Sequence, residues 1–319
     1  MADQMIALRS IASLETLRST VQDDNAIHAL TTLVPSWDQL RKLSTEQQSN
    51  LLGKQYVLPL LPPEPTRAPL GSGVRCLTRY QIDYPANLRS LRTPPLLIYV
   101  KGELPSSNVA TILGTKYPSP IGIEMARDSA RAAVAAGFSV AVRHQTQLGS
   151  TAISEVLNMG GTILLVCAQG VDAFGTFDGV AKTVLSAHGC VVTTSAPMRS
   201  TSSVESSSAD NLLVGLSDIV IIPEAAPTPD GGRFAVSKAI KEGKLLVVPS
   251  VTSSDGDLLP FPSSAVGSAA LSLGPGFDES MFGINTKIHS RLRSGLTAAD
   301  FVVSTPADLA DAFAFVKKQ

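Results

Sequence analysis

Three short segments of this 319-residue sequence combine glycines with polar side chains that can bind anions. The first lies between the apolar run 109–113 and a helical pattern that begins near Ile121, and its candidate phosphate-binding residues are Gly114, Thr115, Lys116 and Ser119. A glycine lets a ligand approach the backbone closely, and the N–H groups at a helix start attract anions. The segment matches neither GxGxxG nor a Walker A sequence, so a plain strand-to-helix turn is the alternative.

The second segment begins at Arg143, after another apolar run, and contains Ser150. If both runs are parallel strands, it lies at the same carboxyl edge of the sheet, where open α/β sheets bind their ligands. Ser150 or Thr151 also fits as the cap of the next helix, so a polar loop with a capped helix explains the same residues without a ligand. His144 has no Asp or Cys partner nearby in the sequence, which gives a catalytic role no support.

The third segment follows a run that ends at Ile222, and its candidate residues are Gly231, Gly232 and Arg233. Paired glycines can bring main-chain N–H groups close to a ligand, with the arginine near a helix N-terminus. A glycine-containing helix start is the alternative. The sequence contains no HExxH, GxSxG, paired-carboxylate or metal-ligand pattern.

Positioning these segments requires strands and helices that alternate from about residue 74 onward. The expected strands are 97–101, 109–113, 139–142, 162–168, 189–193, 219–222, 245–248 and 301–303. The expected helices are 121–136, 151–158, 177–187, 211–215, 233–242, 285–293 and 306–315. Strands that are apolar throughout and separated by helices indicate an α/β, Rossmann-like fold, with a mostly parallel sheet and helices on both faces.

Apolar periodicity and composition predict that the chain divides into three parts. Residues 1–58 show apolar residues at three- to four-residue steps and predict a small helical domain. Residues 59–73 are rich in proline and read as a linker, and residues 74–319 form the Rossmann-like domain. The segment 252–278 is poor in charge and rich in Ser, Gly and Pro, which predicts a surface loop or a poorly ordered insertion.

Charge, aromatic content and cysteine count exclude several classes of protein function. The formal net charge is −1 and aromatic residues make up 5%, which argues against a strongly basic nucleic-acid binder and against a surface of stacked bases. Three widely spaced cysteines give neither a disulfide framework nor a CxxC metal site. The N-terminus has no signal-peptide core, and no apolar run approaches about 18 residues, so we expect a cytoplasmic protein with no membrane partner.

Several segments together resemble the DNA-processing protein A (DprA/Smf) family over roughly residues 80–315. They are residues 84–88, 93–102, 113–116, 119–122, 211–218, Glu224–Ala225, Gly231, 248–249 and Asn285. The resemblance implies a Rossmann-like domain that binds single-stranded DNA and hands it to a RecA-type recombinase during transformation. It also implies a homodimer that is a binding module and not an enzyme, and that needs no metal or cofactor. Because the chain stops soon after the last expected helix, we expect no C-terminal winged-helix domain.

The sequence departs from the family pattern in its phosphate-facing loops. Thr146 stands where an arginine is expected, and Gly149 stands where an aspartate is expected. A serine-containing lead that ends at Asp210 replaces an arginine-rich one, and Asp230 begins the third segment in place of a serine. Each lost arginine removes a phosphate contact, and the two aspartates add repulsion. Candidates for compensation are Lys116, Arg143, Arg199 and Arg233.

Three functional hypotheses follow. The first is a divergent DprA-like single-stranded DNA-binding protein, which predicts that Lys116, Arg143 and Arg233 converge on one pocket. The second is a small-nucleotide sensor or enzyme, which predicts a closed pocket around the glycines of the first and third segments. The third is an interaction protein that keeps only a vestigial pocket.

Overall fold

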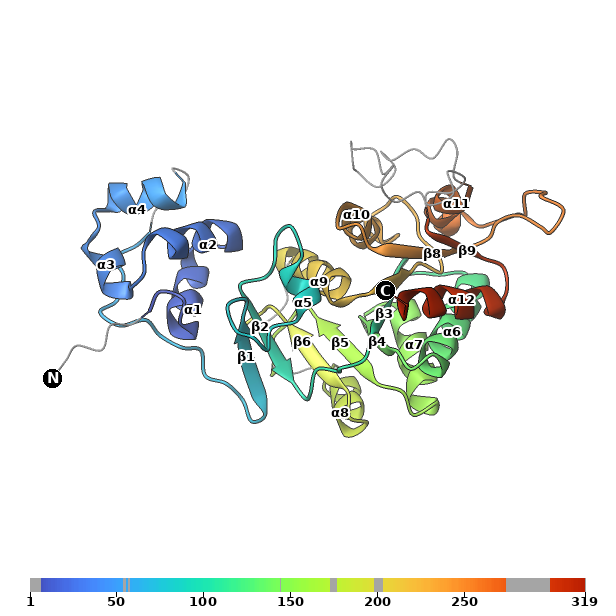
Figure 1. Cartoon of the computed structure of the whole chain (residues 1–319), viewed down its shortest axis with the longest axis horizontal. Coiled ribbons are helices and arrows are strands. Elements are labelled where there is room, and N and C mark those ends of the chain that lie inside the picture. The colour runs from blue at the N-terminus through green and yellow to red at the C-terminus, as the bar shows by residue number, and fades with distance from the viewer. Residues whose placement is uncertain are drawn as a thin grey trace.

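A mostly parallel sheet runs through the molecule, with helices packed on both of its faces (Figure 1). The structure is a computed structural model, and it describes residues 7–53, 56, 58–143, 145–172, 177–197, 203–273 and 299–318. Among these residues nine strands pair in the order β1-β2-β6-β5-β4-β3-β7-β8-β9. Their bounds are β1 Val74–Thr78, β2 Leu97–Lys101, β3 Val109–Ile112, β4 Ser139–Val142, β5 Ile163–Cys167, β6 Cys190–Thr193, β7 Ile219–Ile221, β8 Leu245–Pro249 and β9 Phe301–Val303.

β1 and β2 pair antiparallel, as do β2 and β6, and the other neighbours pair parallel. Successive strand residues face opposite sides: Leu97 and Tyr99 belong to one buried core, while Ile98 and Val100 belong to the other. Strands with two covered faces must be apolar at every position, which is why the sequence shows continuous runs. The expected Rossmann-like α/β fold is confirmed.

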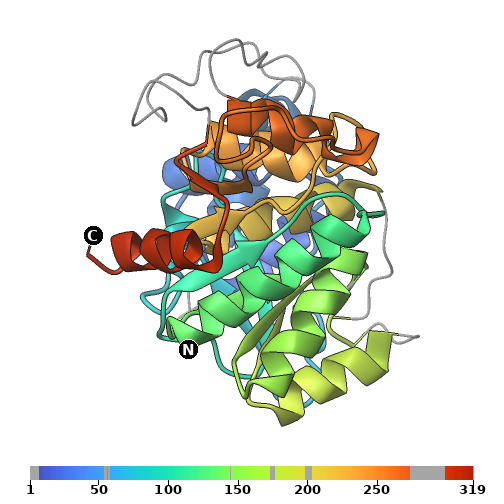
Figure 2. The ribbon, with the colours of Figure 1, turned by 90° about the vertical axis from the view of Figure 1, so that its right-hand side faces the viewer.

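Each face of the sheet has its own set of helices (Figure 2). One face carries α6 Pro120–Ala135, α7 Gln147–Asn158, α8 Phe177–Ser186 and α12 Pro306–Val316. The other carries α5 Ala86–Arg89, α9 Ser203–Leu216, α10 Arg233–Lys241 and α11 Val266–Leu273. The connection from β3 through α6 leads to β4 on one side of β3, whereas β7 lies on its other side. Such a reversal of strand order opens a crevice at the carboxyl ends of the two strands.

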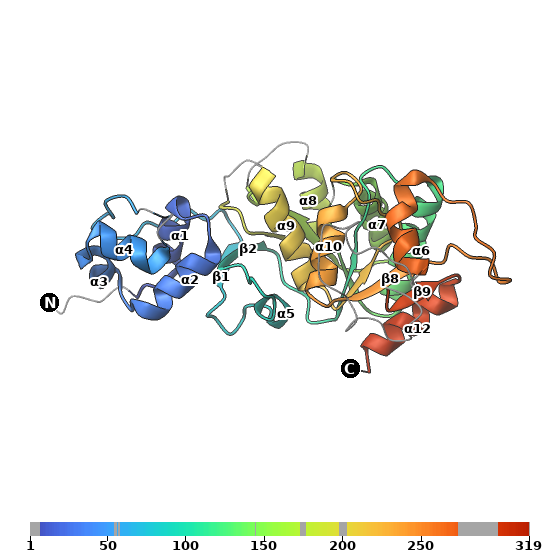
Figure 3. The ribbon, with the colours of Figure 1, turned by 90° about the horizontal axis from the view of Figure 1, so that it is seen from above.

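The N-terminal helices lie at one end of the molecule, beside β1 and β2 (Figure 3). They are α1 Ile11–Thr20, α2 Asp24–Leu33, α3 Trp37–Lys42 and α4 Thr45–Leu52. Each begins after a Ser or Asp whose side chain accepts from the first turn, which satisfies N–H groups that the short helices leave unpaired. Leu14 and Leu17 share a continuous buried core with Leu97 and Tyr99 of β2, so the helices are packed onto the sheet.

The structure differs from the sequence expectations at several elements. All expected strands form, with ends within one residue, but β1 was not anticipated, because this edge strand carries the exposed Arg75 in a short mixed pattern. The segment 252–278 is not simply a loop: α11 lies within it, and its Leu271 is fully buried. α7 begins at Gln147 and α9 at Ser203, both earlier than expected. The expected helix 285–293, His144 and Arg199 lie outside the described residues.

Candidate phosphate-binding site

A cavity of about 700 Å³ lies at the crevice between the loops that follow β3 and β7. It is within the usual size range of small-molecule sites. Four of the residues expected from the sequence line it: Gly114, Lys116, Arg143 and Gly232. Thr146, Asp210, Asp230 and Phe234 are also in its wall. The three segments that lie far apart in the sequence are therefore brought together, because each follows a strand whose carboxyl end reaches this edge.

Two glycines allow the loops to meet. Gly232 has a φ of 85°, in the left-handed region that side chains rarely adopt, and a Cβ there would lie 2.5 Å from the Gly114 carbonyl oxygen. A Cβ on Gly114 would lie 2.2 Å from the carbonyl oxygen of Glu224. Backbone atoms cannot yield to such contacts, so both positions require glycine. The approach is held by a hydrogen bond from the Lys116 N–H to the carbonyl of Asp230, at 2.7 Å.

The helix that follows Gly232 presents its N-terminus to the cavity. Gly232 and Ala235 both line the cavity, and no side chain in the described part of the chain caps α10. The Arg233 N–H donates to the carbonyl of Thr228 at 3.2 Å. The helix dipole still places partial positive charge at this end and favours an anion.

Lys116 and Arg143 add positive charge, but Arg143 is paired. Its Nη1 lies 2.5 Å from Oδ1 of Asp210, and the two side chains are only 15% and 19% exposed. Burial raises the pKa of Asp210 above its ordinary value, and the nearby Arg143 partly offsets that rise. An incoming phosphate must therefore compete with an internal carboxylate for this guanidinium.

Two of the expected phosphate ligands are used inside the protein. Glu224 is buried, and its carboxylate accepts from the Ser119 N–H at 3.0 and 3.1 Å and from the Ser119 hydroxyl at 2.5 Å. This carboxylate occupies the N-terminus of α6, where an external phosphate was expected. Thr115 is buried as well, and its N–H donates to the carbonyl of Glu224 at 2.8 Å.

Three other expected residues do not line the cavity. Ser150 is exposed within the first turns of α7, whose cap is Thr146 and not Ser150, because the Thr146 hydroxyl accepts from Gly149 N–H at 3.0 Å. Gly231 is buried in the turn before α10. The Arg233 guanidinium carbon lies 5.1 Å from the ring centre of Phe234, beside the cavity wall.

Sequence reasoning missed three contributors. Glu224 was noted as a family residue, but its place at the α6 N-terminus depends on a contact across 105 positions. The pairing of Asp210 with Arg143 spans 67 positions and has no local signal. Phe234 did carry a local signal, because it follows two glycines in the first turn of an expected helix. The structure places it in the cavity wall.

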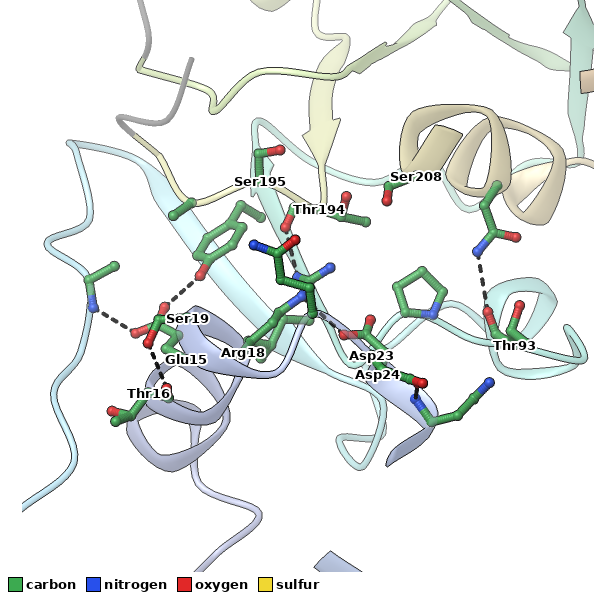
Figure 4. A pocket seen from close by; sticks show the side chains of 18 of the residues that line it. Glu15, Thr16, Arg18, Ser19, Asp23, Asp24, Thr93, Thr194, Ser195 and Ser208 are labelled. Carbon is green, nitrogen blue, oxygen red and sulfur yellow. Dashed lines mark hydrogen bonds and ion pairs between the residues drawn. The ribbon is translucent and has the colours of Figure 1, made fainter. Parts of the chain in front are cut away.

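A second cavity, of about 580 Å³, lies between the N-terminal helices and the sheet (Figure 4). Several of its charged groups are held by one another, by the backbone or by a tyrosine hydroxyl. Arg18 lies 3.0 Å from Asp24 and donates to the Thr194 carbonyl at 2.8 Å, and Glu15 accepts from the Tyr99 hydroxyl at 2.7 Å. These contacts fasten α1 and α2 to β2 and to the end of β6.

Within the described ranges, no cluster of three or more His, Cys, Asp or Glu residues is arranged to hold a metal ion. Cys76, Cys167 and Cys190 are buried as free thiols. Over the same ranges, no helix has both the length and the apolar character needed to span a bilayer.

The fold and the site define a Rossmann-like protein with a pocket at the point where the strand order reverses, lined by Lys116, Arg143 and the start of α10. A sequence model of the family described as DNA recombination-mediator protein A matches residues 75–257, more than half of the chain. The chain belongs to this family.

The chain is similar to several solved structures at low sequence identity, and the first of them has the same fold. DNA processing protein A from Streptococcus pneumoniae matches with a TM-score of 0.60 and 14% identity, over 81% of this chain and 96% of that one. DNA processing protein A from Helicobacter pylori, described with a single-stranded DNA binding mode, matches with a TM-score of 0.47 and 21% identity, over 58% and 84%. The molybdenum cofactor carrier protein from Chlamydomonas reinhardtii matches with a TM-score of 0.40 and 14% identity, over 67% and 99%. No curated protein sequence matches the chain.

Proposed function

We propose that this protein binds single-stranded DNA, with backbone phosphates in the pocket between the β3 and β7 loops. The observation that carries the proposal is the convergence of Lys116, Arg143 and the uncapped N-terminus of α10 on one cavity. Family membership supports it, as does the description of the Helicobacter pylori relative as a single-stranded DNA binder. The role is binding and positioning of a strand, with no chemical step.

The carboxylates in the cavity wall limit the expected affinity for DNA. Asp210 and Asp230 both line the cavity, and Asp210 already holds Arg143. Each neutralised phosphate contributes a salt-dependent increment to affinity, so a site with few cations binds weakly at physiological salt and more tightly at low salt. We therefore expect binding that is clear at 50 mM salt and much weaker at 200 mM.

The test is a fluorescence-anisotropy titration of labelled oligo-dT with the full chain over a series of salt concentrations. Saturable binding that weakens as salt rises supports the proposal. Absence of binding at the lowest salt concentration would overturn it.

A small nucleotide is the second candidate, because the cavity volume of about 700 Å³ also accommodates a mononucleotide at a helix N-terminus. A thermal-shift series with mononucleotides separates the two readings. A nucleotide that stabilises the protein strongly while oligo-dT does not bind would favour the second candidate.

Three further proposals accompany the first, and they rest on the family. The protein acts as a homodimer, which sedimentation equilibrium can test. It passes the bound strand to a RecA-type recombinase, which is tested by recombinase loading on DNA coated with a single-strand-binding protein. It works in the cytoplasm, which cell fractionation can test.

A further inference from the structure

The cavity between the N-terminal helices and the sheet is separate from the proposed phosphate pocket and shares no lining residue with it. Its volume of about 580 Å³ is within the size range of sites for small molecules. Its wall is formed by α1, α2, the segment 66–68, β2, the residues after β6, and α9 (Figure 4). A ligand bound there would contact both the N-terminal helices and the sheet.

The wall of this cavity carries more negative than positive charge. Its charged residues are Glu15, Arg18, Asp23, Asp24 and Arg67, which leave one negative charge in excess. Arg18 is paired with Asp24 at 3.0 Å. Among the described residues, neither Glu15 nor Asp23 lies within ion-pair distance of a basic side chain. Two carboxylates of the wall therefore lack a cationic partner.

Both of these carboxylates are held in place by neutral donors. Glu15 accepts from the Tyr99 hydroxyl at 2.7 Å, and Asp23 accepts from the Tyr56 hydroxyl at 2.8 Å. Asp23 also accepts from the Ala26 N–H at 3.0 Å, and this hydrogen bond is the main reason that the pKa of Asp23 lies below its ordinary value. The fixed carboxylates keep their charge at neutral pH, and a ligand with cationic groups complements them.

The rest of the wall favours a ligand that is rich in N–H donors and partly apolar. At its α9 end, the side-chain oxygen of Asn211 is buried and has no hydrogen-bond partner among the described residues. Pro95 and Leu97 add apolar groups to the same wall. Figure 4 shows Glu15 and Asp23 on opposite sides of Arg18, so the two carboxylates are separated along the cavity.

We propose that this cavity binds a linear diamine or polyamine, with one ammonium group at Glu15 and another at Asp23. An ammonium group is a compact cation with several N–H donors, and it forms charge-assisted hydrogen bonds with carboxylates. The methylene groups between the ammonium groups lie along the apolar part of the wall. The inference goes beyond the proposed function, because the site needs no contact with the phosphate pocket. The bound amine joins the N-terminal helices to the sheet and stabilises the folded chain.

The experiment is a calorimetric titration of the full chain with spermidine, at low salt and without DNA. One saturable site per chain is expected, together with a melting temperature that rises with spermidine concentration. The control ligand is 1,8-octanediol, an uncharged chain with the same number of non-hydrogen atoms. It should neither bind nor stabilise the protein, because it lacks the ammonium groups.

Asp23→Asn removes one charge from the wall but keeps a side-chain oxygen at the start of α2, where asparagine caps a helix as well as aspartate does. It is expected to weaken spermidine binding by about 10- to 100-fold, the loss that accompanies one hydrogen bond to a charged group. Asp38→Asn is the matched control, since Asp38 lies in the first turn of α3 and does not line the cavity. It should leave the affinity unchanged. Thermal unfolding without ligand checks that both variants fold.

Glu15→Gln tests the other end of the cavity and is expected to weaken binding by a similar factor. An unchanged affinity in this variant would overturn the proposal even if Asp23→Asn failed to fold. Absence of spermidine binding at low salt would also overturn it, as would an equal response to 1,8-octanediol. Equal losses in Asp23→Asn and Asp38→Asn would refute the site, because they would show diffuse attraction to an acidic surface.

The titrations contain no DNA, so the two proposals fail independently. If spermidine does not bind, the proposed phosphate site stands. If oligo-dT does not bind, the proposed amine site stands.

Discussion

At the scale of single residues, the site is a balance between a few cations and the carboxylates that oppose them. Lys116 lines the cavity, and no ion pair involving it occurs within the described residues. Arg143 lines the same cavity but is paired with Asp210. The competition between phosphate and Asp210 therefore decides how much of the available positive charge reaches a ligand.

Lys116→Ala is expected to weaken oligo-dT binding and to make the dependence of log K on log salt shallower by about 0.7, one single-strand phosphate contact. Anisotropy titrations at four or more salt concentrations measure the slope. The matched control is Lys317→Ala, an exposed lysine near Gly137 at the C-terminal end of α6, away from the cavity. An unchanged slope in Lys116→Ala would contradict the assignment.

Asp210→Asn is expected to tighten oligo-dT binding by about 3- to 10-fold at neutral pH and low salt, because it removes the carboxylate that pairs with Arg143 and the negative charge it brings to the cavity. The pKa of Asp210 is raised by burial, so it protonates at a higher pH than an ordinary aspartate. Affinity of the unmodified protein should therefore rise toward that of the variant as the pH falls. Titrations from pH 8 to pH 5 measure the difference, and a constant ratio would refute this role.

At the scale of elements, the helices that begin at the crevice differ in how their N-termini are satisfied. The N-terminus of α6 is filled by the buried Glu224 carboxylate, whereas that of α10 begins at a glycine without a side-chain cap. The Glu224 carboxylate accepts the N–H and hydroxyl of Ser119 at the start of α6, and it thereby joins the loops that follow β3 and β7. Among the helices that begin at the crevice in the described residues, α6 and α7 have a side-chain partner at the N-terminus, whereas α10 has none.

Gly232→Ala is expected to destabilise the protein by about 1–3 kcal/mol and to weaken oligo-dT binding, because the new Cβ is strained and meets Gly114. Urea unfolding and anisotropy measure the two effects. Gly243→Ala is the matched control: its φ is +69°, but a Cβ there has no atom within 4 Å. It should cost about 1 kcal/mol and leave binding unchanged. Equal effects of the two substitutions on binding would count against the pocket.

At the scale of the whole molecule, the net electrostatic field is weak, and the N-terminal helices share a buried core with the sheet. With a formal net charge of −1, the chain provides little long-range attraction for DNA, so affinity depends on contacts inside the pocket. The N-terminal helices are fixed to the sheet edge by a shared core and by Arg18, Asp24 and Glu15. They lie beside the sheet end that is farthest from β9 (Figure 3).

Arg18→Ala is expected to lower the free energy of unfolding by about 1–2 kcal/mol, because it removes a partly buried ion pair and a charged hydrogen bond to Thr194. Urea denaturation measures the change. Arg41→Ala, at an exposed arginine of α3, should change it by less than about 0.5 kcal/mol. Oligo-dT affinity should stay the same in both, since neither residue lines the proposed site. A stability of Arg18→Ala equal to that of Arg41→Ala would be the contrary result.

The sequence by itself determined the fold class and every described strand except β1, because strands covered on both faces must be apolar at every position. It also located Gly114, Lys116 and Gly232 near one edge, since parallel strands bring their carboxyl ends together. Only the tertiary structure decided which groups remain available there. Glu224 reaches Ser119 across 105 positions and Asp210 reaches Arg143 across 67, so no local pattern could show that one helix N-terminus is filled and one arginine is held. Such contacts depend on how the loops meet, and that is set by packing of the whole sheet.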